Sequence, residues 1–134
     1  HVWRGYGSAI FVEFGELAPG KKMKNGKIGN PNGELTLMID WSWRVERRRS
    51  ILGGSWSSEK KWDGIFKKIH GATVVSVETF GYLPEIIVSL SNGLRIVSFN
   101  TSEGQPDWAI LTRKPKLGSL CVERGILKIQ HQNS

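Results

Sequence analysis

The chain of 134 residues contains a single cysteine, Cys121, so it cannot form a disulfide within itself. Disulfide frameworks stabilise small secreted domains, whereas a chain without one fits a reducing compartment. No run of apolar residues is long enough to cross a bilayer, and no signal-peptide pattern is visible. We therefore expect a cytoplasmic protein.

The motifs of common catalytic and cofactor sites are also missing. There is no G-x-G-x-x-G and no P-loop, the usual cradles for phosphate. The three histidines and the cysteine lie far apart in the sequence, with no pair at metal-ligand spacing. The run Gly53–Ser57 (GGSWS) lacks the second glycine of a nucleophile elbow. We expect no metal, cofactor or catalytic residue, and lean away from an enzyme without settling that question.

What the chain has in excess is positive charge. It carries 19 lysines and arginines against 12 acids, for a net charge of +7. Such a balance favours anionic partners, either acidic protein faces or nucleic acids and nucleotides. The same charge also serves solubility alone, so it does not decide between partners.

A β-hairpin is predicted over Leu83–Ser98, where two runs of Ile, Val and Leu flank Ser91-Asn92-Gly93. A three-residue loop with Gly93 left-handed pairs Val88 with Ile96 and Ser89 with Arg95, which separates apolar from polar faces. A two-residue loop would mix them. We therefore predict the three-residue loop.

The stretch Glu34–Glu46 alternates strictly between apolar and polar residues and predicts one long, bent strand. Its apolar positions, including Trp41 and Trp43, should face the core. A helix is predicted over Ser58–His70, because Trp62, Ile65, Phe66 and Ile69 recur at helical spacing. A second hairpin is predicted around Arg124-Gly125, with Val122 opposite Leu127 and Leu120 opposite Ile129.

These elements predict one domain over residues 1–134, of the α+β class but mostly β. The expected architecture is an antiparallel sheet curled towards a barrel or sandwich and covered by the one helix at about residues 58–70. Residues 18–33 hold four glycines and four lysines but no acid. We predict a flexible basic loop there, or a long hairpin tip.

The binding residues that we predict are mostly arginines near the end of the long strand. Arginines hold phosphate and carboxylate groups, and exposed tryptophans stack on bases or anchor protein partners. The predicted set is Arg44, Arg47, Arg48, Arg49, Ser55, Arg95 and Trp108. Trp3, Tyr6, Trp56 and Tyr82 are further candidate stacking surfaces if they are exposed. An ion pair of Arg44 or Arg47 with Glu46 is the purely structural alternative.

The pattern W-x-W-R-V-E at Trp41–Glu46 is followed by S-I-L-G-G-S, by L-S-N-G-L-R-I-V-S-F and later by Trp108. Over about the central two-thirds of the chain, this pattern resembles small uncharacterised bacterial proteins of the kind found near toxin or defence gene clusters. The resemblance implies a bacterial protein and brings no catalytic residue with it.

Three functions remain open from the sequence. The first is a non-catalytic binding module for an anionic partner, with an acidic protein face as the leading partner, as in an immunity or regulatory protein. The second is a protein that binds single-stranded nucleic acid or nucleotides. The third is a metal-dependent phosphodiesterase that uses Asp40 and Glu46, provided that a bend or another strand brings a second carboxylate close.

Overall fold

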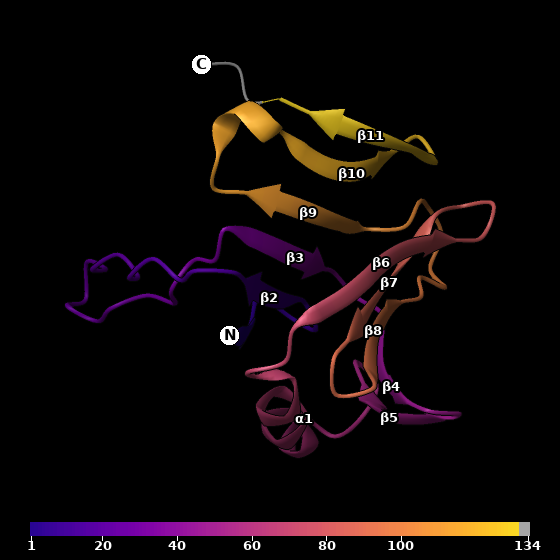
Figure 1. Cartoon of the computed structure of the whole chain (residues 1–134), viewed down its shortest axis with the longest axis horizontal. Coiled ribbons are helices and arrows are strands. Elements are labelled where there is room, and N and C mark those ends of the chain that lie inside the picture. The colour runs from indigo at the N-terminus through magenta and orange to yellow at the C-terminus, as the bar shows by residue number, and fades with distance from the viewer. Residues whose placement is uncertain (132–134) are drawn as a thin grey trace.

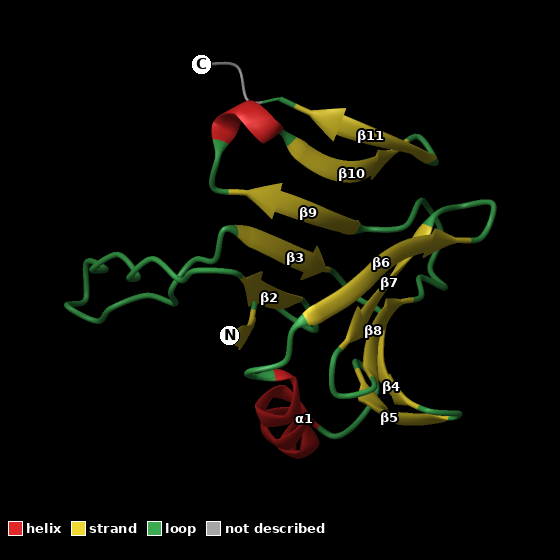
Figure 2. Cartoon of the chain, in the orientation of Figure 1, coloured by secondary structure: helices red, strands yellow, loops and turns green. Residues whose placement is uncertain are grey.

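The computed structural model describes residues 1–131 and is built mostly of strands and loops, with one α-helix and short 3-10 turns (Figure 2). Two antiparallel sheets face one another as a sandwich and do not close into a barrel. Within the described residues, no helix is long and apolar enough to span a membrane. The predicted class, mostly β with one covering helix, is confirmed, and of the two predicted architectures the structure has the sandwich.

The first sheet has six strands and the second has five. In spatial order the first sheet contains β1 (Val2–Arg4), β2 (Ile10–Phe14), β3 (Leu35–Ile39), β9 (Trp108–Thr112), β10 (Ser119–Glu123) and β11 (Ile126–Gln130). The second contains β5 (Ser50–Gly54), β4 (Trp43–Arg47), β8 (Leu94–Ser98), β7 (Glu85–Leu90) and β6 (Val74–Phe80). The chain changes sheet twice, between β3 and β4 and between β8 and β9 (Figure 1).

The helical segment joins β5 to β6, the two edges of the second sheet. A 3-10 turn, η1 (Glu59–Lys61), runs directly into α1 (Trp62–Ile69), and a second turn, η2 (Pro115–Leu117), precedes β10. Figure 1 shows α1 beside β5 and below β2, where it closes one side of the sandwich. The four apolar residues predicted to face inward, Trp62, Ile65, Phe66 and Ile69, are all buried.

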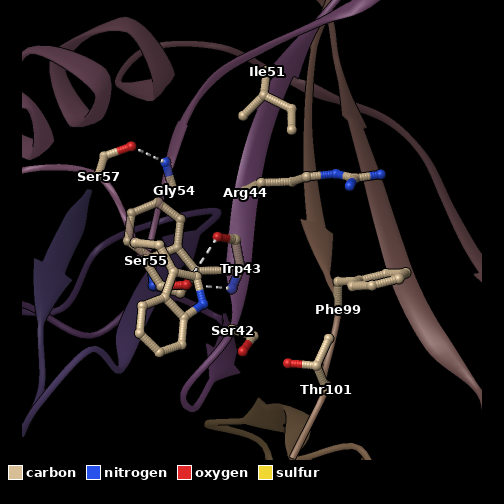
Figure 3. A pocket seen from close by; sticks show the side chains of 10 residues that line it. Ser42, Trp43, Arg44, Ile51, Gly54, Ser55, Ser57, Phe99 and Thr101 are labelled. Carbon is tan, nitrogen blue, oxygen red and sulfur yellow. Dashed lines mark hydrogen bonds between the residues drawn. The ribbon is translucent and has the colours of Figure 1, made fainter.

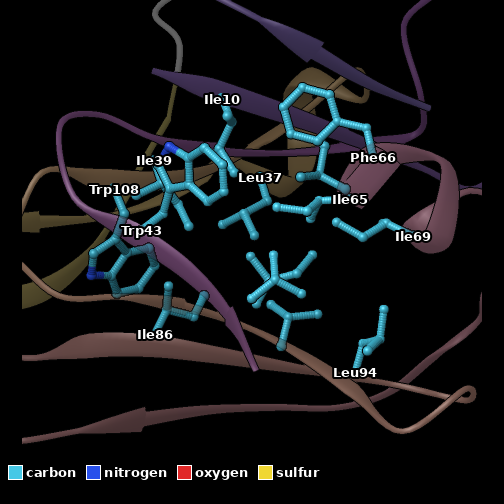
Figure 4. Close-up of a cluster of buried hydrophobic side chains, with 14 of the residues drawn as sticks. Ile10, Leu37, Ile39, Trp43, Ile65, Phe66, Ile69, Ile86, Leu94 and Trp108 are labelled. Atoms are coloured by element: carbon cyan, nitrogen blue, oxygen red, sulfur yellow. The ribbon is translucent and has the colours of Figure 1, made fainter. Parts of the chain in front are cut away.

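The core lies between the two sheets and the helix (Figure 4). Strands β2 and β3 contribute Ile10 and Leu37, and Ile86 and Leu94 enter from β7 and β8. Because residues alternate along each strand, the opposite faces of these strands stay available for polar side chains. Because the inward-facing residues of the second sheet are fixed by this core, the residues between them are the ones that face outward.

Both predicted hairpins are confirmed in register. Val88 lies opposite Ile96 and Ser89 opposite Arg95, with Gly93 left-handed at φ 83°. In the last hairpin, Val122 faces Leu127 and Leu120 faces Ile129. Residues 18–33 form a projecting arm held by isolated bridges from Ala18 to Asn32 and from Lys22 to Ile28, which is the long-hairpin alternative.

The prediction of one unbroken strand over Glu34–Glu46 is wrong. The segment splits into β3 and β4, because Trp41 adopts a left-handed backbone with φ 67° and turns the chain from one sheet to the other. Trp41, predicted to face the core, is instead 61% exposed. Leu37 and Ile39 before the break and Trp43 and Val45 after it remain buried, so the alternation survives although the strand does not.

Candidate functional site: an aromatic groove beside a basic end

Two of the predicted arginines lie on the outer face of the second sheet and share one acid. Arg44 Nε is 2.8 Å from Glu46 Oε2, and Arg95 Nε is 3.0 Å from Glu46 Oε1. Arg95 also donates to the main-chain oxygen of Arg48. The structure therefore brings Arg44 and Arg95 together through Glu46, which cancels part of their charge.

The other arginines lie where β4 turns into β5: Arg47 ends β4, and Arg48 and Arg49 form the turn. Arg47 and Arg48 line a hollow of about 470 Å³ together with Asn92 of the β7–β8 turn. The end of α1 borders it, because Asn92 Nδ2 donates to Lys68 O over 2.7 Å.

We call Arg47, Arg48 and Arg49 the basic end. Within the described residues, none of the three forms a salt bridge.

Trp108 does not belong to an exposed binding surface, and that prediction is wrong. Its side chain is 2% exposed, and its Nε1 donates to Pro84 O over 2.9 Å beneath the β6–β7 turn.

Ser55, another predicted binding residue, lies in the wall of a pocket. Its main-chain N and its Oγ bond Trp43 O, and Trp43 N donates to the same Oγ over 3.2 Å. Ser55 thus fixes the wall of a pocket, and its hydroxyl is already occupied.

That pocket, of about 360 Å³, opens on the outer face beside β4 and β5 (Figure 3). We call it the aromatic groove. It is lined by Ser42, Trp43, Arg44, Ile51, Gly54, Ser55, Trp56, Ser57, Phe99 and Thr101. Trp56 is 88% exposed, and Phe99 is about half exposed. Figure 3 shows the Arg44 side chain extending toward Phe99, and its Cζ lies 5.4 Å from the centre of that ring.

The segment that carries Trp56 is anchored on both sides, so the groove has a fixed shape. Gly54 N donates to Ser57 Oγ over 3.0 Å, and Ser57 N donates to Gly54 O over the same distance. Trp62 Nε1 also donates to Gly54 O, over 3.0 Å, which ties the groove to the helix. An exposed tryptophan on an anchored loop loses little conformational freedom when a partner covers it.

Trp56 is one of the candidate aromatic surfaces predicted from the sequence, whereas Phe99 was not predicted. Phe99 follows β8, and its main-chain N donates to Ser42 O over 3.1 Å, which continues the pairing beyond the strand. The available signal was the alternation of β8 itself. Arg95, Val97 and Phe99 alternate along the same side of the chain, so Phe99 should share the face of Arg95, although Val97 between them is only 1% exposed.

The described residues contain no group of three His, Cys, Asp or Glu side chains placed to hold a metal ion. Asp40 lies in the link between β3 and β4 and does not share a strand with Glu46. It instead lies near Asp107, whose residue is exposed overall but whose carboxyl is partly desolvated. That desolvation raises the pKa of Asp107, and the negative charge of Asp40 and a hydrogen bond with it raise the pKa further. Burial likewise raises the pKa of Glu85, although Asn100 N donates to it over 2.7 Å.

These raised pKa values predict that stability falls as the pH rises. In the unfolded chain both carboxyls have ordinary pKa values, so over that range the unfolded state loses its protons while the folded state keeps them. The free energy of unfolding should therefore decrease from the ordinary carboxyl range through the raised values. We expect Asp107→Asn to be more stable than the parent near neutral pH, with a difference that shrinks in acid, measured by urea unfolding across a pH series.

The matched control for this prediction is Glu103→Gln, which alters another carboxyl in the same loop. We expect that variant to follow the parent curve. An Asp107→Asn protein that is less stable than the parent near neutral pH would show that the carboxylate is held favourably, contrary to the prediction.

Comparison with known proteins gives no relatives: no family model, no curated protein and no solved structure matches the chain.

Proposed function

We propose that the protein is a non-catalytic binding module that engages an acidic protein partner. The aromatic groove would receive an apolar or aromatic side chain of the partner, and the basic end would meet its acidic residues. The observation that carries the proposal is Trp56, which stands 88% exposed beside Arg44 and Phe99 at the mouth of a preformed pocket. Tryptophan and arginine are the residues most enriched where protein interfaces gain their energy.

The charge pattern favours a protein partner over nucleic acid. A single strand needs a groove of continuous positive potential for its phosphates. Here Glu46 lies between Arg44 and Arg95, and Glu78 lies in the same cross-strand row as Arg44. A phosphate backbone along this face would meet both carboxylates. A folded protein partner can instead place its acidic residues opposite the arginines and away from Glu46 and Glu78.

Binding of single-stranded nucleic acid is the second candidate function. The combination of an exposed indole, a half-exposed phenyl ring and an arginine over that ring favours it, because bases stack on such surfaces. In this reading Trp56 and Phe99 would stack bases, and the basic end would hold phosphates. An immunity or regulatory protein is the kind of protein that the first candidate function implies.

The test compares soluble probes that share negative charge but differ in side chains. We expect the protein to bind a random Glu–Tyr copolymer more tightly than poly-glutamate, because only the copolymer offers rings to the groove. Trp56→Ala should weaken copolymer binding by about tenfold or more, since an interface anchor contributes at least about 1.4 kcal/mol. Affinities are measured by fluorescence anisotropy of the labelled probes.

The matched control is Tyr82→Ala, which removes a fully exposed ring from the β6–β7 turn, away from the groove. It should bind the copolymer as the parent does. Tighter binding of oligo(dT) than of the copolymer, with an affinity that falls steeply with salt, would replace the first function by the second. Equal copolymer binding by the parent and Trp56→Ala would remove the groove from the proposal.

A further inference from the structure

A second pocket lies behind the aromatic groove, at the link between the two sheets. It has a volume of about 340 Å³ and is lined by Trp41, Asn100, Ser102, Glu103, Gln105 and Asp107. The two pockets share one segment of chain. Phe99 and Thr101 line the aromatic groove, whereas the alternate residues Asn100 and Ser102 line this one. The second pocket therefore faces a different way and needs its own explanation.

Trp41 is presented to this pocket by a backbone that is held in place. Its φ of 67° lies in the left-handed region, which bulky residues avoid. Ser8 Oγ donates to Trp41 O over 2.7 Å, and Asp40 N donates to Asp107 O over 3.0 Å. The indole is nevertheless 61% exposed. An unfavourable backbone that displays a large apolar ring is not explained by core packing, and such sites tend to be functional.

The remaining wall is polar, and part of it is already organised. Asn100 Nδ2 donates to Gln105 O over 3.0 Å, and its Oδ1 accepts from Ser102 N over 3.1 Å, which shapes the loop. Gln105 Oε1 accepts from Gly125 N over 3.0 Å. Within the described residues, the Gln105 amide nitrogen and the Glu103 carboxylate form no hydrogen bond, so both donor and acceptor groups remain available.

We propose that this pocket binds a neutral saccharide. A pyranose ring has a face of C–H groups that packs on an indole and an edge of hydroxyls that bond planar amides and carboxylates. The pocket offers one such ring in Trp41, with Glu103, Gln105 and Asp107 as polar partners. It has no basic residue to hold an anion and no aliphatic residue to hold a purely apolar ligand. Its volume lies within the range of small-molecule sites.

Saturation-transfer NMR tests the proposal with the methyl glycosides of glucose, galactose, mannose and N-acetylglucosamine. We expect transfer to at least one glycoside, strongest at the C–H groups of one ring face. Trp41→Gly removes the indole and suits the left-handed backbone, so the variant should fold. It should bind that glycoside about tenfold more weakly or not at all, whereas Trp41→Tyr should keep part of the affinity.

Trp56→Ala serves as the matched control, because it removes an exposed indole from the other pocket and should leave glycoside binding unchanged. Tetramethylammonium is included as a cation probe, since indole and carboxylates also attract cations. Saturation transfer to tetramethylammonium without any glycoside, or to no probe at all, overturns the saccharide assignment. Glycoside binding that survives Trp41→Gly and fails in Trp56→Ala overturns the site.

Discussion

We expect Trp62→Ala to lower the free energy of unfolding by about 3–5 kcal/mol, a large part of the roughly 5–15 kcal/mol that holds a domain together. The Trp62 side chain is 2% exposed and packs against Trp43 and Phe66, at ring-centre distances of 5.4 and 6.4 Å. Its Nε1 bonds Gly54 O, and the Arg4 guanidinium lies 4.6 Å above its ring. Alanine would leave a cavity where the helix meets the edges of both sheets.

The matched control for this prediction is Trp56→Ala, the same substitution six positions earlier on an exposed ring. We expect that variant to differ from the parent by about 0.5 kcal/mol or less, as surface changes usually do. Both values are obtained from urea unfolding followed by circular dichroism. Equal losses for the two variants would mean that the helix does not pack on the sandwich as described.

The elements that the sequence predicted correctly are those whose signal is local. The β7–β8 hairpin follows from the position of Gly93, and the helix from four apolar residues at helical spacing. In each case one register alone places every apolar side chain on one face. Burial then selects that register without reference to the rest of the chain.

The sheet change at Trp41 could not be predicted in this way, because the apolar alternation runs through it unbroken. Leu37, Ile39, Trp43 and Val45 all face the core, but in two different sheets. Only the distribution of strands between the sheets shows that the chain must turn there. The left-handed backbone of a tryptophan carries no sequence signal, since glycine or asparagine is the usual residue at such a position.

The candidate site was predicted only in part, because some of its features depend on contacts between distant segments of the chain. The arginine turn follows from local pattern and is exposed, as expected. The ion pair between Arg95 and Glu46 joins positions 49 residues apart and forms because β4 pairs with β8 in the sheet. The burial of Trp108 likewise depends on Pro84, which a distant turn places over it. Exposure of an aromatic ring is a property of the packed sandwich and not of its own strand.

The second large effect concerns two glycines for which alanine should act with opposite sign. At Gly54, a Cβ would lie 2.4 Å from Trp43 O and 3.1 Å from Arg44 Cα, both main-chain atoms of the paired strand. Because the backbone cannot move away without breaking the β4–β5 ladder, we expect Gly54→Ala to lower the free energy of unfolding by about 1–3 kcal/mol or more. The same shift would widen the floor of the aromatic groove and weaken copolymer binding.

At Gly64, on the exposed face of α1, an added Cβ would have no atom within 4 Å apart from the neighbouring residues and the backbone of the helix itself. Alanine there removes conformational freedom from the unfolded chain and should raise the free energy of unfolding by up to about 1 kcal/mol. Urea unfolding of both variants measures the two effects on one scale. Because Gly64→Ala leaves the groove untouched, it also separates stability from recognition: its copolymer affinity should equal the parent's. A stable Gly54→Ala protein would show that β4 and β5 are not packed backbone to backbone, and the groove would then have no fixed floor.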